Sequence, residues 1–244
     1  GRVPPSLDYP QVTLHEALSR TVARVPGSIA WSFLGTKSTY RELGDALVGL
    51  AGGLGWLGLA PGGRVAVFLE KRIEAVVASF AVSAAGGVLV PVNPLLKAAQ
   101  VVHILQDADV QVLVTSASRL SALRSALGEC PSLAHVVCCD LHDGPETATF
   151  NLHAWSAVLA AGPQKLPRSL ETDVAAIFYT SGSTGQPKGV VLSHRNLVAG
   201  ATSVARFLNN RPDDTLLAVL PLSFDAGFSQ LTTAFLVGAR VVLL

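Results

Sequence analysis

Runs of consecutive apolar residues alternate with longer segments of helical periodicity along the middle of the chain. Several of the runs are typical of strands buried on both faces, at residues 64–69, 88–92, 110–116 and 135–140. The segments between them are predicted to be helices, at residues 71–87, 98–108 and 119–130. Because parallel strands need a helical crossover, this alternation predicts an α/β fold of mainly parallel sheets flanked by helices on both faces.

A further helix is predicted upstream of the first strand, over residues 38–58. Its apolar positions recur at helical spacing, although several glycines interrupt them. Ser38 or Thr39 is placed to cap the first turn, and Glu42 is placed to close a capping box. The helix is therefore expected to begin close to residue 39.

Residues 141–170 interrupt the pattern with turn-forming Gly-Pro and Leu-Pro pairs and one weak helix around Trp155, so we predict a surface connection there. This divides the chain into a first α/β subdomain over residues 1–170, connection included, and the start of a second over residues 171–244. In the second subdomain a strand after Asp173 enters a polar segment. The remaining predicted elements are a strand at 190–192, a helix at 194–208, a turn and strand within 211–222, and a helix, glycine turn and strand within 229–244.

The composition is that of a chain with a large core. Of 244 residues, 50% are hydrophobic and 14% are charged, which excludes a disordered chain. The formal net charge of +1 leaves no broad basic field, so we expect no nucleic-acid partner. Residues 75–96 carry no charge, but a Gly-Gly pair divides them. We expect a buried helix and strand there rather than a membrane span.

The cysteines and histidines do not indicate a metal site. Cys130, Cys138 and Cys139 lack metal-ligand spacing and are expected to be small apolar residues, as suits a reducing cytoplasm. The histidines likewise form no metal spacing. We expect His194 to lie at the start of a helix, where its ring caps the helix or packs.

The segment YTSGSTGQPKG, residues 179–189, separates two apolar runs. Its glycines let the backbone approach a ligand, and successive backbone N–H groups can form an anion-binding concavity. Hydroxyl donors and a phosphate-binding charge are supplied by Thr180, Ser181, Ser183, Thr184 and Lys188. The segment therefore predicts a polyphosphate site. The segment differs from the common P-loop pattern GxxxxGK[ST], in which the lysine is followed by a helical Ser or Thr. Here Lys188 is followed by Gly189 and a predicted strand. A plain hydrophilic hairpin is the alternative.

The longer stretch YTSGSTGQPKGVVLSHRNL resembles the signature of the adenylate-forming superfamily: acyl-CoA synthetases, luciferases and peptide-synthetase adenylation domains. The stretch beginning AVSAAGGVLVPVNP is similar to an earlier helix–strand segment of that family. LLAVLPLSFDAG and GARVVLL are similar to later ones. The resemblance thus extends over most of the chain.

This resemblance implies a two-step reaction. A carboxylate attacks the α-phosphorus of ATP, giving an acyl-adenylate and pyrophosphate, and the acyl group then passes to a thiol of coenzyme A or a phosphopantetheine carrier. By the same resemblance Lys188 and Thr180 act in catalysis, and the residues contacting the phosphates are Thr180, Ser181, Gly182, Ser183, Thr184, Gly185 and Lys188. Mg²⁺ is implied as well, with its ligand from a family segment that this sequence lacks.

The segment PLSFDAGFSQ, residues 221–230, is the second place where the resemblance implies a role. In many acyl-CoA synthetases a histidine beside the activated carboxylate stands where this chain has Phe224. In amino-acid-activating relatives the Asp of FDxS holds the substrate ammonium group, which matches Asp225, but Gly227 replaces the final serine. Asp225 is thus expected either to face a substrate amine or to cap or turn the loop.

Several parts of the family pattern are missing, among them the YGxTE-like segment and the small C-terminal domain. We therefore expect the N-terminal portion of an AMP-forming carboxylate–thiol ligase, inactive by itself. The alternatives are an amino-acid-activating adenylation domain, a non-catalytic nucleotide-binding module, and a phosphotransferase or NTPase with an unusual loop.

Overall fold

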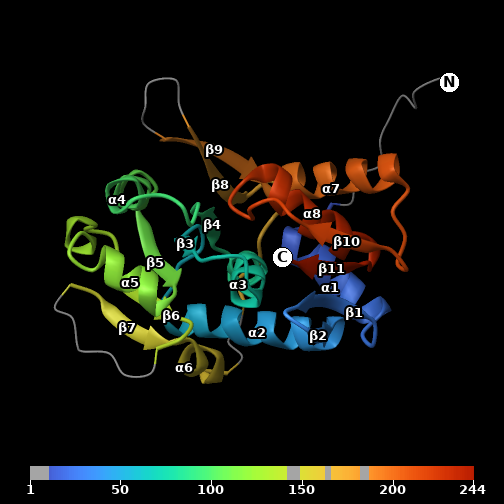
Figure 1. Cartoon of the computed structure of the whole chain (residues 1–244), viewed down its shortest axis with the longest axis horizontal. Helices are drawn as coiled ribbons and strands as arrows, with labels where there is room; N and C mark the ends of the chain where they lie inside the picture. Colours follow the sequence, from blue (N-terminus) through green and yellow to red (C-terminus); the bar gives the residue numbers. More distant parts are fainter. Residues whose placement is uncertain (1–10, 142–148, 163–165, 182–186) are drawn as a thin grey trace.

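The computed structural model describes residues 11–141, 149–162, 166–181 and 187–244, and its strands form two sheets (Figure 1). The seven-stranded sheet has, in order, β7 (Asn151–Ala154), β6 (His135–Cys138), β5 (Val110–Thr115), β3 (Arg64–Phe68), β4 (Val88–Pro91), β8 (Val174–Ser181) and β9 (Pro187–Ser193). The four-stranded sheet has β10 (Thr215–Ala218), β11 (Arg240–Leu243), β1 (Ile29–Phe33) and β2 (Thr36–Thr39). The pairs β8–β9 and β1–β2 are antiparallel and the others are parallel.

The helices cover both faces of the seven-stranded sheet. The α-helices of the described residues are α1 (Leu14–Arg24), α2 (Tyr40–Trp56), α3 (Ile73–Ala84), α4 (Ala98–Asp107), α5 (Ala117–Leu123), α6 (Trp155–Ala160), α7 (His194–Leu208) and α8 (Asp225–Val237). Val65 and Val67 of β3 join the core formed with α2, α3 and α8, whereas Ala66 and Phe68 join the core formed with α4 and α5. This alternation confirms the predicted α/β fold with helices on both faces.

Both sheets take strands from the two sides of residue 170. β8 and β9 extend the sheet that begins with β3, and β10 and β11 pair with the early strand β1. The subdomain boundary that we proposed near residue 170 therefore runs through the sheets rather than between them.

Most predicted elements are present, although α1, β1 and β2 have no predicted counterpart and several other regions differ. The helix predicted over residues 119–130 is divided into α5 and a short 3₁₀ turn, Leu127–Glu129. Residues 141–170 contain a strand, β7, besides the expected helix at Trp155. β7 is short and half-exposed, so it lacks an apolar run, and its pairing with β6 defines it as a strand.

The predicted capping box of α2 is present. The Thr39 N–H donates to Glu42 Oε2 over 2.7 Å, and the Glu42 N–H donates to Thr39 Oγ1 over 3.3 Å. The apolar stretch at residues 75–96 forms the buried helix α3 and strand β4, as predicted. Among the described residues, no helix combines the length and the apolar character that crossing a membrane requires.

His194 packs at the start of α7, where Ser193 and not His194 provides the cap. The imidazole is 1% exposed, and its Nδ1 accepts the Leu14 N–H of α1 over 3.2 Å. Burial, with a smaller effect of the nearby His15, lowers the pKa of His194 to about 4. The ring is therefore neutral and ties α1 to α7.

The glycines of α2 have different surroundings. A Cβ atom at Gly53 would lie 2.2 Å from the Val158 carbonyl oxygen of α6, so only glycine allows this approach. At Gly49 the nearest atoms, of Leu159, would lie at 3.5 and 3.6 Å, an ordinary contact.

We expect Gly53→Ala to lower the free energy of unfolding by about 1–3 kcal/mol, because α2 and α6 must move apart. Gly49→Ala in the same helix is the matched control, and its better helix propensity should leave stability unchanged or raise it by up to about 1 kcal/mol. Urea unfolding measures both, and equal effects of the two substitutions would contradict the packing argument.

We also expect His194→Asn to reduce the acid sensitivity of the fold. The imidazole is protonated near pH 6.5 in the unfolded chain but only near pH 4 in the folded protein. The contribution of the neutral ring to the free energy of unfolding is therefore complete above pH 6.5 and is lost as the pH falls towards 4. The loss amounts to roughly 3 kcal/mol. Asn can still accept the Leu14 N–H. Unfolding measured from pH 7.5 to 4.5 should show a shallower decline for the variant, and parallel curves would refute the assignment.

Candidate functional site

The described ends of the polar segment 179–189 lie in the paired strands β8 and β9 (Figure 1). β8 continues to Ser181 and β9 begins at Pro187, three residues earlier than predicted, so both ends of the segment are strand. Tyr179 pairs with Gly189, Thr180 with Lys188 and Ser181 with Pro187. The expectation of one long loop is therefore wrong for residues 179–181 and 187–189, which are strand. Their backbone N–H and C=O groups pair at the sheet edge, although their side-chain pattern is that of a loop.

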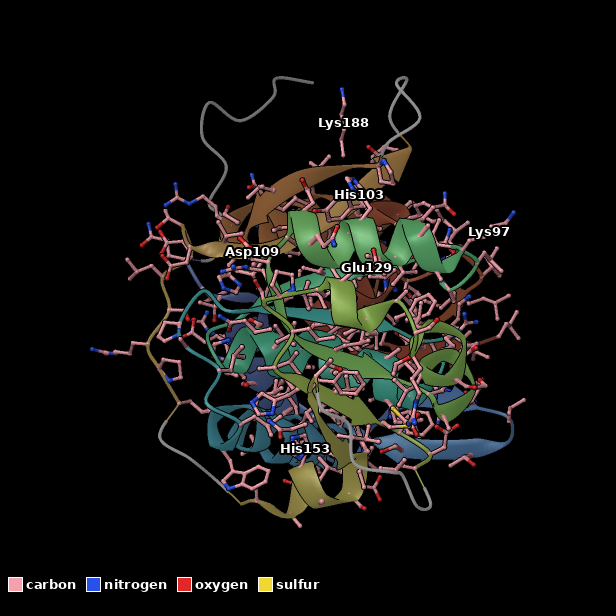
Figure 2. The ribbon with its side chains drawn as sticks, turned by 90° about the vertical axis from the view of Figure 1, so that its left-hand side faces the viewer. Lys97, His103, Asp109, Glu129, His153 and Lys188 are labelled. Atoms are coloured by element: carbon pink, nitrogen blue, oxygen red, sulfur yellow. The ribbon has the colours of Figure 1, made fainter. Side chains whose placement is uncertain are left out.

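Thr180 and Lys188 are brought together by this pairing. Both are exposed, and the Thr180 hydroxyl donates to the Lys188 carbonyl oxygen over 3.5 Å. Figure 2 shows the Lys188 side chain projecting from the hairpin away from the body of the protein. Among the described residues it has no ion pair. Its ammonium group is thus free to bind an anion from solution.

The other predicted phosphate contacts cannot be placed in the same way. Gly182, Ser183, Thr184 and Gly185 lie outside the described residues. Ser181 is the last described residue of β8, and its partner is Pro187.

Gly189 has a packing role that the pattern did not indicate. A Cβ atom there would lie 2.7 Å from Ile177 Cγ2 and 3.2 Å from Tyr179 Cζ. Glycine therefore lets the Tyr179 ring lie against β9, where it is 9% exposed.

Phe224, Asp225 and Gly227 form the entry to α8. Phe224 precedes the helix and is 42% exposed, and Asp225 is its exposed first residue. Gly227 is buried, and a Cβ atom there would lie 2.0 Å from the Pro221 carbonyl oxygen. The turn before α8 thus lies directly on the helix, which accounts for glycine in place of the expected serine.

Asp225 does not cap α8 through its side chain. Phe224 holds the cap position without a side-chain hydrogen bond, and Asp225 has no hydrogen bond or ion pair with the described residues. Its negative charge is favourable in the first turn of the helix. Of the two expected roles, local capping is therefore not observed, and the carboxylate is available to a ligand.

Two cavities adjoin this turn. One, of about 250 Å³, lies between α7 and α8 and is lined by Leu197, Gly200, Asp225, Phe228 and Ser229, among others. The other, of about 260 Å³, lies beyond the carboxyl ends of β3 and β4, and residues 221–223 line it. In open α/β sheets ligands bind at this end of the strands.

The second cavity contains charged and polar groups that the sequence reasoning missed. Arg119 pairs with Glu70 at 2.5 Å, and Lys71 Nζ donates to the Ala218 carbonyl oxygen over 2.6 Å. Burial lowers the pKa of Lys71. Ser223 is 7% exposed, and its hydroxyl has no partner among the described residues. Ser223 lies in the segment 221–230, but Glu70, Lys71 and Arg119 are far from that segment in the chain, so no local motif could have indicated that they line one cavity with it.

The described residues offer no cluster of three His, Cys, Asp or Glu side chains that could hold a metal ion. His135 and His153 form a pair with 3.1 Å between ring nitrogens, without a third such ligand.

Comparison with known proteins finds matches over nearly the whole chain. A family model for AMP-binding enzymes matches residues 18–244. The chain is 34% identical over 233 residues to phosphinothricin tripeptide synthetase PhsC of Streptomyces viridochromogenes, covering 95% of this chain and 20% of that protein. It is 29% identical over 245 residues to tyrocidine synthase 2 of Brevibacillus parabrevis, covering 100% of this chain and 6% of that protein.

Solved structures share the fold. A long-chain-fatty-acid-CoA ligase of Archaeoglobus fulgidus matches with a TM-score of 0.88 and 24% identity, over 98% of this chain and 48% of that one. The N-terminal subdomain of Klebsiella oxytoca NpsA matches with a TM-score of 0.76 and 25% identity, over 96% and 54%. The chain spans about half the length of these structures and a fifth or less of the peptide synthetases. With its family match over residues 18–244, the chain belongs to the AMP-binding enzymes, within the adenylate-forming superfamily that its signature segment resembles.

Proposed function

We propose that the protein activates a carboxylic acid with ATP. The carboxylate oxygen bonds to the α-phosphorus, the bond from that phosphorus to the bridging oxygen breaks, and pyrophosphate leaves with the bonding electrons. The acyl group of the adenylate then passes to the thiol of coenzyme A or of a phosphopantetheine carrier, and AMP leaves. The observation that carries this proposal is the pairing of exposed Thr180 and Lys188 on the hairpin of an AMP-binding chain.

The proposed role of this hairpin is to bind the leaving pyrophosphate. Lys188 supplies a positive charge and Thr180 a hydroxyl donor at adjacent strand positions. Negative charge grows on the β- and γ-phosphates as the bond to the α-phosphorus breaks, so donors at this place lower the barrier. Ser181, Gly182, Ser183, Thr184 and Gly185 remain proposed contacts to the same phosphates. When bound, Mg²⁺ would neutralise phosphate charge.

ATP–pyrophosphate exchange by the full-length protein tests the proposed role of Lys188. Lys188→Ala should lower kcat/KM for ATP in ATP–pyrophosphate exchange by about a hundredfold, because the positive charge that would stabilise the leaving pyrophosphate is lost. Lys37→Ala, which removes an exposed lysine on β2 of the other sheet, is the matched control and should retain wild-type exchange. Equal activity of the two variants would contradict the assignment of Lys188.

A second candidate is the activation of an amino acid. It is supported by the peptide synthetases among the relatives and by the unpaired carboxylate of Asp225, which lines the cavity between α7 and α8. A substrate ammonium group in that cavity would pair with this carboxylate. A plain acyl or aryl acid would make no such pair.

Asp225→Asn separates the two candidates. If the substrate is an amino acid, kcat/KM for it should fall by roughly tenfold to a hundredfold, because a charge-assisted hydrogen bond is lost. Exchange with the corresponding acid without the amine should not change. Asp213→Asn, at another exposed aspartate, serves as control. An unchanged preference for amines in Asp225→Asn would exclude this carboxylate as their partner.

Other function classes predict different products. A nucleotide-binding module would bind ATP without turnover in the full-length protein, and an NTPase would release orthophosphate rather than pyrophosphate. We further propose that residues 1–244 alone form no adenylate, since they span about half of the solved ligases. The cytoplasm is the proposed location, on the basis of the free cysteines among the described residues.

A further inference from the structure

The distal part of the β8–β9 hairpin extends beyond the sheet that carries it. β8 is paired with the neighbouring strand β4 at Ala176, opposite Leu89. From Tyr179 to Ser181 the ladder partner of β8 is β9, which forms the edge of the sheet and is largely exposed. A two-stranded ribbon is marginally stable by itself in water, so its distal end needs support from another element.

Helix α4 provides that support with two side chains. Asp107 Oδ2 accepts the Tyr179 hydroxyl over 2.5 Å, and His103 Nε2 lies 3.3 Å from the Pro187 carbonyl oxygen. Since a carbonyl oxygen can only accept, His103 Nε2 carries the proton in this bond. Figure 2 shows His103 on α4, directly below the hairpin that carries Lys188.

The two contacts form one unit. His103 and Asp107 are four residues apart on α4 and therefore share a face of the helix. Asp107 reaches β8 through Tyr179, next to Thr180, and His103 reaches β9 through Pro187, next to Lys188. Tyr179 also packs in the hydrophobic cluster that includes apolar residues of α4. Both strands are thus held just before the segment proposed to bind phosphate.

We propose that His103 and Asp107 are positioning residues for the phosphate-binding hairpin. They make no proposed contact with the nucleotide, and they act by fixing the direction in which Thr180 and Lys188 are presented. The expected effect on catalysis rests on the proposed function, whereas the expected effect of the two hydrogen bonds on the hairpin does not depend on any activity. Loss of the contacts should leave the fold intact and increase the opening of the hairpin.

Hydrogen exchange of the full-length protein tests whether His103 and Asp107 hold the hairpin. His103→Leu removes the donor to Pro187, Tyr179→Phe removes the donor to Asp107, and each should accelerate exchange of amides in residues 177–181 and 187–191 by about tenfold. His103→Gln keeps an N–H donor and should restore protection. Gln106→Ala is the matched control, since this α4 side chain donates to the Glu129 carbonyl oxygen and not to the hairpin.

Steady-state kinetics test the catalytic consequence. In ATP–pyrophosphate exchange, His103→Leu and Tyr179→Phe should each lower kcat/KM for ATP by about tenfold and leave the KM of the acid unchanged. His103→Gln should recover most of the loss. A loss of general stability would instead change both KM values and the thermal midpoint, and rescue by Gln would be absent.

The outcomes separate this inference from the proposed function. Unchanged exchange of the hairpin amides in both Tyr179→Phe and His103→Leu would overturn the positioning role, whatever the activity. Faster hairpin exchange in the variants, with no pyrophosphate exchange by the wild type for any acid, would support the contacts from α4 and refute the proposed function. If one variant fails to fold, the other tests the same hairpin.

Discussion

The burial of α3 between the two sheets is the constraint on which the rest of the structure depends. Its residues from Ala75 to Ala84 are buried on all sides, so the helix has no polar face. Phe80 packs against Phe228 and Phe235 of α8, with ring centroids 5.8 and 5.5 Å apart. This contact joins α3, which packs on β3 and β4, to α8, the helix that carries Asp225.

The two parts of the candidate site are built in different ways. The turn before α8 is supported by the core, because Gly227 lies directly on Pro221 and Phe228 is buried beside it. The hairpin of β8 and β9 lies at a sheet edge with its side chains largely exposed. A phosphate site on such a hairpin can admit and release a polar ligand, but it requires contacts from α4 to keep one direction.

Sequence reasoning recovered the parts of the fold that depend on local pattern. The capping box at Thr39 and Glu42, the buried helix α3 and the buried strands β3, β4 and β5 follow from the spacing of apolar and capping residues. β7 was missed because an edge strand needs only one partner and no apolar run. The length of β9 was underestimated because polar residues at a sheet edge pair through their backbone, and the pattern of apolar and polar side chains does not report backbone pairing.

The sequence by itself determined the α/β class, the signature segment with Thr180 and Lys188, and the pair Phe224–Asp225, since these depend on periodicity and on residue types close together in the chain. Only the tertiary structure decided that β8 and β9 join the sheet of β3, that β1 pairs with β11, and that His103 and Asp107 lie against the hairpin. The reason is physical: the spacing of a single Asp or His along the chain indicates nothing. The role of Asp107 or His103 arises from a group 72 or 84 residues away that folding brings within hydrogen-bond distance.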